Sequence, residues 1–204
     1  MVSNANYDSA WEIPIINATN KIPNRLVKFS NAISTNDFDQ WVHFYEYDYE
    51  FEKLWTNPRK YLSHLSKFNG VITPDFSLYR DMPLVMQAWN TYRGKALGHW
   101  WQSHSLNVIS NIRWGDERTY DFCCAGVPRN SVIAVGSYGC MKILRERKFF
   151  AEGLEYAIKT LTPKVIVVYG SAPDCMFAQY KKIGVEIVQF EADYWRLQGK
   201  EMKA

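Results

Sequence analysis

The densest run of chemically capable side chains in the sequence spans residues 73–81, Thr-Pro-Asp-Phe-Ser-Leu-Tyr-Arg-Asp. Four of its side chains, Asp75, Ser77, Tyr79 and Arg80, supply a carboxylate, two hydroxyl groups and a guanidinium. A carboxylate can serve as a general acid or base. Arg80 could grip a phosphate or a carboxylate, because its guanidinium donates two parallel hydrogen bonds. The run directly follows the β-branched segment Val71-Ile72, so we predict that it lies where a strand ends.

Other strand-like segments are also followed by carboxylates, aromatic rings or cations. These side chains include Asp48, Arg113, Trp114, Asp116, Tyr138 and Tyr169. In parallel α/β folds the segments after the strands share one edge of the sheet, and ligands bind at that edge. We therefore predict Asp75 and Asp116 as catalytic residues, with Asp48 as a further carboxylate. The predicted ligand-binding residues are Ser77, Tyr79, Arg80, Trp114, Tyr138 and Tyr169.

Four of these side chains also have a structural alternative. Asp75 and Asp116 could cap helices or brace turns, which is a frequent role of aspartate. Arg80 could form a salt bridge with Asp81 or Asp75 instead of binding a ligand. The Trp114 ring could stack on a base or a sugar, or it could pack into the core.

Several classes of site are disfavoured by spacing. His99 and His104 lie five residues apart, whereas zinc-binding histidines on a helix lie four apart, and we expect no metal. Ser77 lacks the G-x-S-x-G motif of a serine hydrolase. The segment Gly136-Ser137-Tyr138-Gly139 is neither a dinucleotide-binding fingerprint nor a P-loop. The sequence names no cofactor.

Composition indicates a globular protein with an unusual aromatic content. The chain has 204 residues, of which 47% are hydrophobic and 22% charged, with a net charge of +3. This charge is only mildly basic and does not by itself indicate nucleic-acid binding. Aromatic residues make up 16% of the chain and include eight tryptophans, which implies a thick core or a stacking surface. The four cysteines form no C-x-x-C pair, and we expect reduced core thiols.

Strand-like and helix-like segments alternate after a polar lead-in that contains Pro14 and Pro23. We predict a lead-in of residues 1–24 and a single α/β domain of residues 25–204. The predicted strands span residues 26–29, 41–45, 71–73, 106–109, 131–135, 164–169 and 185–190. The predicted helices span residues 58–67, 83–103, 119–125, 143–161 and 175–183. Such alternation predicts a mainly parallel sheet, either an incomplete or irregular β/α barrel, which we favour, or an open doubly wound sheet.

Two further expectations concern the long helix and the cellular setting. Val85, Trp89, Tyr92, Ala96 and Trp100 recur at three- and four-residue spacing, which predicts one apolar stripe facing the core. No run approaches the roughly 18 apolar residues that span a bilayer, and the N-terminus lacks the pattern of a signal peptide. We therefore expect a cytoplasmic protein without a membrane partner.

Several ordered segments carry a family resemblance. They are residues 51–55 with Asn57-Pro58, residues 70–79 (Gly-Val-Ile-Thr-Pro-Asp-Phe-Ser-Leu-Tyr), residues 89–93 (Trp-Asn-Thr-Tyr-Arg), Val108-Ile109 leading to Trp114 with Asp121-Phe122-Cys123, and residues 168–170. From about Leu26 to Gly170 the chain resembles the bacterial and phage family called domain of unknown function 4417. The resemblance implies a home on phages, plasmids or related mobile elements. It implies no activity and no catalytic residue.

Three functions are compatible with these observations. The first is a non-enzymatic mobile-element protein that binds a nucleotide or nucleic acid in replication or counter-defence, which the aromatic content and mild basicity favour. The second is a hydrolase of a phosphoester or glycosidic bond that uses strand-end carboxylates. The third is a protein-binding inhibitor of a host enzyme. The sequence does not decide between an enzyme and a binding protein, nor does it indicate the oligomeric state.

Overall fold

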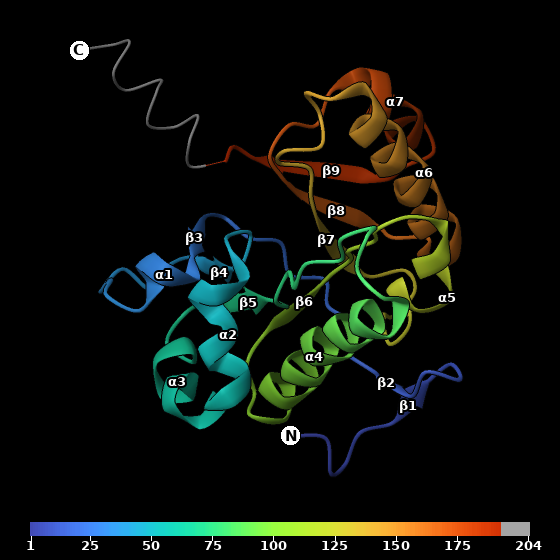
Figure 1. The fold of residues 1–204 in the computed structure, drawn as a ribbon. Coiled ribbons are helices and arrows are strands. Elements are labelled where there is room, and N and C mark those ends of the chain that lie inside the picture. The colour runs from blue at the N-terminus through green and yellow to red at the C-terminus, as the bar shows by residue number, and fades with distance from the viewer. Residues whose placement is uncertain (193–204) are drawn as a thin grey trace, which may run out of the picture.

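The structure, a computed structural model, describes residues 1–192 and is built on seven parallel strands (Figure 1). The strands lie side by side in chain order, so each crossover returns the chain to the next position in the sheet. They are β3 (Leu26–Lys28), β4 (Trp41–His43), β5 (Gly70–Ile72), β6 (Val108–Asn111), β7 (Val132–Gly136), β8 (Val165–Tyr169) and β9 (Glu186–Phe190).

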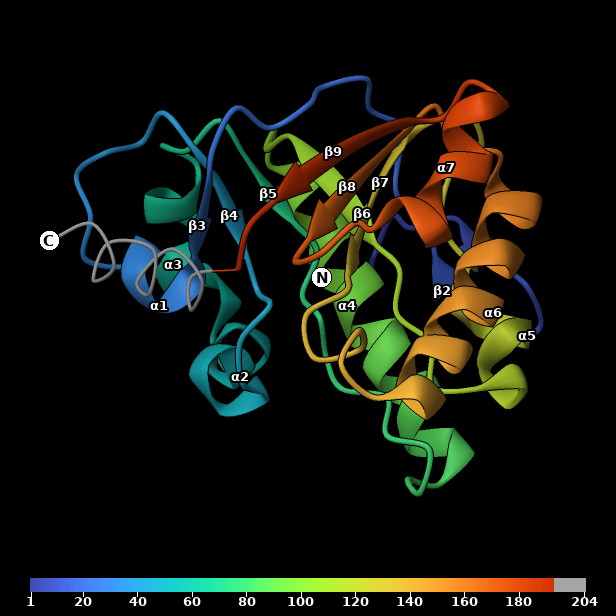
Figure 2. The same cartoon turned by 90° about the horizontal axis from the view of Figure 1, so that it is seen from above.

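The sheet is curled into a half-barrel with helices on its outer side (Figure 2). The helices are α1 (Phe29–Ala32), α2 (Asp48–Thr56), α3 (Pro58–Leu65), α4 (Leu84–Ser103), α5 (Tyr120–Cys123), α6 (Leu144–Leu161) and α7 (Asp174–Lys182), with a 3₁₀ turn at Glu117–Thr119. The predicted α/β class, the mainly parallel sheet and the incomplete barrel are therefore confirmed. The alternation pattern did not predict α1 and α2, and β6 begins two residues after its predicted start.

Alternation along the strands divides the core into an inner and an outer part. In β8, Val165 and Val167 belong to the inner apolar cluster, whereas Ile166 and Val168 pack outside it. Because successive side chains of a strand point to opposite faces, a strand covered on both faces is apolar throughout. The five residues of β8 are all buried, which explains the continuous apolar run in the sequence.

The apolar stripe expected on α4 is wrong in its first half. Val85 is 70% exposed and Trp89 is 47% exposed, whereas Ala96 and Trp100 are buried as expected. The first turns of α4 instead bury polar side chains, among them Gln87, Asn90, Arg93 and Lys95. Asn90 and Lys95 donate to backbone oxygens near the strand ends, so the buried face of the helix is not its most apolar face.

The lead-in of residues 1–24 packs against the half-barrel. It contains a small antiparallel pair, β1 (Tyr7–Asp8) with β2 (Ile13–Pro14), and it buries Ile13 and Ile16. Ile16 N donates to Gly126 O at 2.9 Å, and β2 lies against α4. The division of the chain at residue 24 remains a prediction, but these contacts attach the segment to the rest of the fold.

The cysteines lie partly in the core and partly nearer the surface. All four cysteines are free thiols; Cys123 and Cys124 lie in the core as expected, whereas Cys175 is exposed and Cys140 is half-buried.

Within residues 1–192, none of the helices combines the length and the apolar character needed to cross a membrane.

Candidate functional site

Two cavities of about 540 Å³ each lie at the carboxyl edge of the half-barrel and share one wall. The shared wall consists of Tyr79, Arg113, Gly136 and Tyr138. We call the cavity beside α6 the arginine pocket, because its lining includes Arg80, Arg113 and Arg145. We call the cavity beside α2 the tyrosine pocket, because its lining includes Tyr45, Tyr47, Tyr49, Tyr79, Tyr138 and Tyr169. Both volumes lie within the range of small-molecule sites.

Asp75 and Arg113 form an ion pair at the junction of the two pockets. Arg113 Nη1 lies 2.6 Å from Asp75 Oδ2, and Asn111 Nδ2 donates to Asp75 Oδ1 at 2.7 Å. Both carboxylate oxygens are therefore engaged. The Asp75 side chain is 8% exposed, whereas that of Arg113 is 37% exposed, so the carboxylate anchors a guanidinium that remains accessible from the pockets.

Burial and charge act on this pair in opposite directions. Burial raises the pKa of the Asp75 carboxyl, and the Arg113 charge and the Asn111 amide partly offset that rise. The Asp75 charge raises the pKa of Arg113. Because a guanidinium stays protonated at any ordinary pH, Arg113 is a permanent cation at the site and Asp75 is its partner.

Tyr45 and Tyr169 line the tyrosine pocket, and the ring of His43 packs against both of them. Tyr45 stacks on Tyr169 with ring centroids 4.9 Å apart, and His43 lies 4.4 Å from Tyr169. Tyr45 Oη donates to Asn111 Oδ1 at 2.9 Å, which joins the rings to Asp75 through one amide. A Cβ atom on Gly136 would lie 2.8 Å from the Tyr45 ring, so only glycine lets the ring approach β7 this closely. Burial lowers the pKa of His43 to about 3, and the imidazole is neutral.

Ser77 is held by a second polar network between α2 and α4. Asp48 accepts hydrogen bonds from Ser77 N at 3.1 Å and from Ser77 Oγ at 2.9 Å. Asn90 Nδ2 donates to Ser77 O, and Arg93 continues the network by donating to Asn90 Oδ1. The strand-end backbone at Ser77 is thereby fixed from both sides, and Asp48 takes a bracing role.

Arg80 is paired with a residue far away in the sequence. Its guanidinium donates to both carboxylate oxygens of Glu146 on α6, at 2.9 and 2.5 Å, and lies 4.3 Å from the centre of the Phe149 ring. The expected alternatives for a salt bridge were Asp81 and Asp75, and the structure gives neither. Arg80 therefore forms a wall of the arginine pocket that is fixed by α6.

Asp116 has the turn-bracing role that was the structural alternative. Its side chain caps the 3₁₀ turn by accepting from Arg118 N at 3.1 Å, and its carboxylate pairs with the Arg118 guanidinium. That pair lowers the pKa of Asp116. Asp116 does not line either large pocket, whereas Asp75 lines the tyrosine pocket, so the two predicted catalytic carboxylates are set apart in the structure. Their catalytic role remains a prediction.

The remaining predicted ligand-binding residues differ in exposure. Trp114 Nε1 donates to Phe149 O at 3.1 Å, and the indole lies directly over Gly153 of α6, where a Cβ atom would overlap the ring. Tyr79 and Tyr138 are 57% and 53% exposed and stand on the shared wall. The tyrosines thus present free ring faces, while Trp114 is a packed part of the wall.

Lys95 is a buried cation beneath the site. The sequence did not predict it as a site residue. Its Nζ donates to Asn111 O at 2.6 Å, and burial lowers the pKa of Lys95 to about 8. A cavity of about 20 Å³, lined in part by Lys95, Asn111 and Arg113, is large enough for one water molecule. The polar residues spaced along 87–95 indicate a polar buried face of α4. The aromatic residues spaced along the same helix suggest an apolar face instead.

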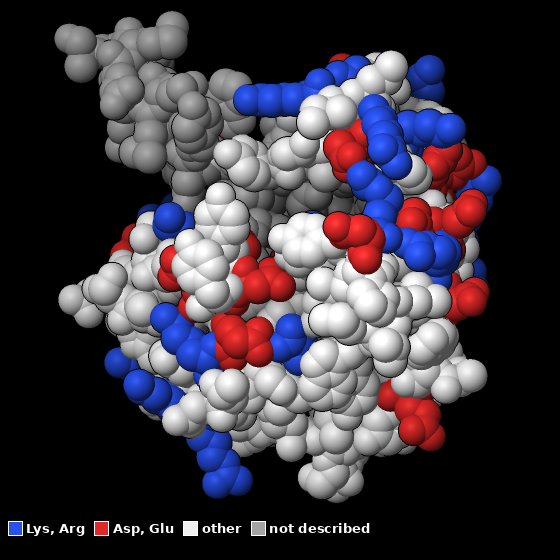
Figure 3. Space-filling model, in the orientation of Figure 1, with Lys and Arg blue, Asp and Glu red and all other residues white. Residues whose placement is uncertain are grey.

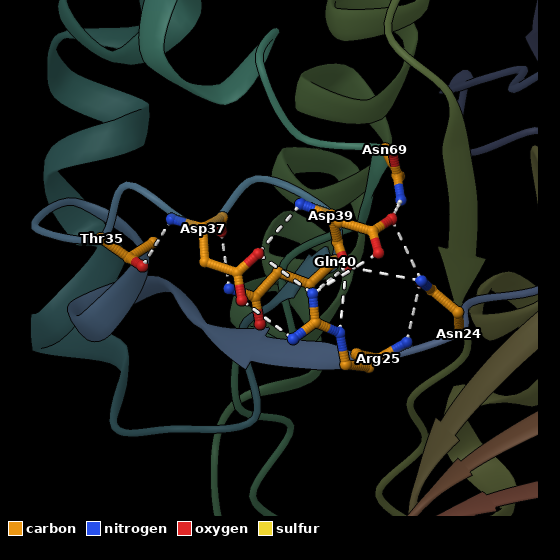
Figure 4. A network of polar contacts seen from close by, with 7 residues as sticks. All are labelled: Asn24, Arg25, Thr35, Asp37, Asp39, Gln40 and Asn69. Atoms are coloured by element: carbon orange, nitrogen blue, oxygen red, sulfur yellow. Dashed lines mark hydrogen bonds and ion pairs between the residues drawn. The ribbon is translucent and has the colours of Figure 1, made fainter.

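The opposite edge of the sheet carries a different kind of polar cluster (Figure 4). Arg25 donates to both oxygens of Asp37 and to Asp39 O, and Asn69 donates to Asp39 Oδ1. These residues precede β3, β4 and β5, so the cluster ties together the loops at the amino ends of the strands. In β/α barrels the residues at this edge contribute to stability and the active site lies at the carboxyl edge, so we interpret the cluster as stabilising.

Acidic side chains outnumber basic ones in the lining of the tyrosine pocket. Figure 3 shows acidic side chains gathered over α2 beside a hollow at the centre of that face. Glu46 and Glu50 line the tyrosine pocket together with Asp75, against the cations Lys28 and Arg113. Within residues 1–192, no group of three or more His, Cys, Asp or Glu side chains is arranged to hold a metal ion.

Comparison with known proteins gives one family and two phage relatives. The family model described as "Domain of unknown function (DUF4417)" matches residues 5–191. The chain is 33% identical over 171 residues to the "Gene 1 protein" of Mycobacterium phage L5, covering 82% of this chain and 74% of the phage protein. It is 32% identical over 174 residues to the "Gene 1 protein" of Mycobacterium phage D29, covering 82% of this chain and 63% of that protein. No solved structure matches the chain.

The family match covers nearly all of the described residues, including every strand of the half-barrel and, apart from Ala192, the lining of both pockets. The segments that carry the resemblance in the sequence, such as residues 70–79, lie within it and supply Asp75, Ser77 and Tyr79 to the site. The chain therefore belongs to the DUF4417 family.

Proposed function

We propose that the protein binds a nucleotide across the two pockets at the carboxyl edge of its half-barrel. The observation that carries this proposal is Arg113, a guanidinium anchored on one side by Asp75 and open to both pockets. A fixed arginine fork is well suited to a phosphate, because it offers parallel donors without the entropy cost of ordering a free side chain.

The surroundings of Arg113 suit the two ends of a nucleotide. Arg145 lines the arginine pocket and makes no hydrogen bond or ion pair within the described residues, so it can add a second cation for the phosphate. The exposed rings of Tyr79 and Tyr138 flank Arg113 and can stack on a base, since every base has a π-face. The phosphate therefore occupies the Arg113 side and the base occupies the tyrosine pocket.

A nucleotide fits these pockets better than a long polymer. The carboxylates of Glu46 and Glu50 beside the tyrosine pocket would repel a phosphate backbone that ran along it. A single phosphate at Arg113 avoids them. The nucleic-acid form of the hypothesis is an outcome of the same experiment, because a strand would bind more tightly than a mononucleotide and would lose affinity steeply with salt.

Calorimetric titration of the full chain with mononucleotides and with a short single-stranded oligonucleotide tests the proposal. We expect saturable binding of a mononucleotide and about a tenfold loss in Tyr138→Ala, the magnitude of a base-stacking contact. Tyr7→Ala is the matched control, because Tyr7 is also an exposed tyrosine but lies on β1, away from both pockets. Absence of binding by any nucleotide would overturn the proposal.

Hydrolysis of a phosphoester bond is the second candidate. The burial of Asp75, which raises the pKa of its carboxyl, is the observation that favours it, since a protonated carboxyl can act as a general acid. Asp75→Asn would then abolish turnover even at nucleotide concentrations that saturate the variant, because it removes the acid as well as the anchor of Arg113. If wild-type protein releases no phosphate or nucleoside from bound nucleotides between pH 5 and pH 8, this candidate is excluded.

A further inference from the structure

We infer that the tyrosine pocket selects guanine among the bases, with Glu50 accepting from the base and Lys28 donating to it. This inference rests on the proposed nucleotide binding and adds a specificity to it. It depends on which polar groups of the pocket are already engaged and which are left for a ligand.

Most polar groups of the tyrosine pocket have partners within the protein. Tyr45 Oη donates to Asn111, both oxygens of Asp75 are occupied, and Ser77 Oγ donates to Asp48. Glu46 Oε1 accepts from Ser30 N at 3.0 Å. These groups hold the pocket in shape and are poorly placed to read a base as well.

Glu50 and Lys28 are different. Both side chains line the pocket and are half-buried, and neither has a hydrogen bond or ion pair within residues 1–192. Glu50 comes from α2 and Lys28 from the end of β3, so the pocket presents an anion and a cation from two separate elements. A ligand that fills the pocket must offer donors to the carboxylate and acceptors to the ammonium.

Guanine meets both requirements. It carries adjacent donors, N1–H and N2–H₂, which match the two oxygens of a carboxylate, and it carries the acceptors O6 and N7, which match an ammonium. Adenine places an acceptor, N1, beside its amino group, and a carboxylate would repel that acceptor. Uracil and cytosine likewise have a single donor site with an acceptor next to it. The stacking surfaces of Tyr79 and Tyr138 accept any base, so the discrimination comes from Glu50 and Lys28.

Titration of the full chain with GMP, IMP, AMP, CMP and UMP tests the inference. We expect GMP to bind roughly tenfold more tightly than AMP, CMP or UMP, the discrimination of one good bidentate pair. IMP lacks the 2-amino group and should fall between GMP and AMP. Glu50→Gln should remove the preference by weakening GMP binding about tenfold and leaving AMP binding within twofold. Glu117→Gln, on the exposed 3₁₀ turn outside the pocket, is the matched control.

The outcomes separate this inference from the proposed function. If all five nucleotides bind within twofold of one another, guanine selection is wrong and nucleotide binding stands. If GMP is preferred but Glu50→Gln keeps the full preference, the assignment to Glu50 is wrong. If no nucleotide binds, both proposals fail. Thermal unfolding of Glu50→Gln, compared with the wild type, shows whether a loss of binding comes from a loss of fold.

Discussion

The ion pair between Asp75 and Arg113 predicts a specific pattern of stability in Arg113→Met. The substitution leaves the Asp75 carboxylate buried, with Asn111 as its remaining hydrogen-bond donor. Breaking a fully buried pair costs about 3–5 kcal/mol, whereas an exposed pair contributes about 0–1 kcal/mol. Arg113 is 37% exposed and Asp75 is 8% exposed, so solvent screens part of the interaction. We expect the free energy of unfolding to fall by about 1–3 kcal/mol at neutral pH.

The pH dependence of that loss identifies its cause. Burial already raises the pKa of Asp75, and removal of the Arg113 charge raises it further. In the variant, the folded-state pKa of Asp75 then lies above the unfolded value of about 4. The contribution of Asp75 to stability therefore falls as pH rises from about 4 through the folded-state pKa. The difference between wild type and Arg113→Met should therefore be small near pH 4 and grow toward pH 7.

Urea unfolding at pH 4.5 and pH 7.5 measures this difference. The double variant Asp75→Asn with Arg113→Met removes the stranded charge and should recover most of the stability lost in the single variant. If the double variant is as unstable as Arg113→Met, or if the loss is the same at both pH values, a buried unpaired carboxylate is not the cause. The argument for Asp75 as the anchor of Arg113 would then fail.

Three further predictions address other parts of the molecule. Gly153→Ala should lower the free energy of unfolding by about 1–3 kcal/mol and shift the tryptophan fluorescence, because the new methyl group overlaps the Trp114 ring; unchanged fluorescence would contradict the packing. His43→Phe should remove a loss of stability that the wild type shows as pH falls from about 6.5 toward 3, because the folded pKa of His43 is about 3, and this is read from unfolding midpoints across that range. Lys95→Met should abolish a gain in stability that the wild type shows between about pH 8 and pH 10, because the folded pKa of Lys95 is about 8; an identical pH profile in variant and wild type would refute its burial as a cation.

The sheet could be predicted from the sequence because its signals are local. The apolar run of residues 165–169 between Pro163 and Gly170 identifies a strand covered on both faces, and alternation with helices implies parallel pairing. The position of the site at the strand ends follows from that topology. Residues 75–79 reach both pockets for this reason.

The partners of the site residues could not be predicted in the same way. Arg80 and Glu146 are 66 residues apart in the sequence, and Asp75 and Arg113 are 38 residues apart. Several acids could have paired with each arginine, and only the packing of α6 against the strand ends selects Glu146. The polar inner face of α4 was missed because Trp89 and Val85 imitate the spacing of a core stripe while facing solvent.

The lead-in has a consequence for the order in which the chain acquires its structure. Asn17 N donates to Gln102 Oε1, Thr19 N to Ser131 Oγ, and Gly126 N to Asp8 Oδ2, across separations of 85, 112 and 118 residues. The lead-in therefore has all three of these partners only once the chain has been synthesised as far as Ser131. Because contacts between residues far apart in the sequence form slowly, we expect the lead-in to dock on α4 and the loop at Gly126 after the local elements have formed.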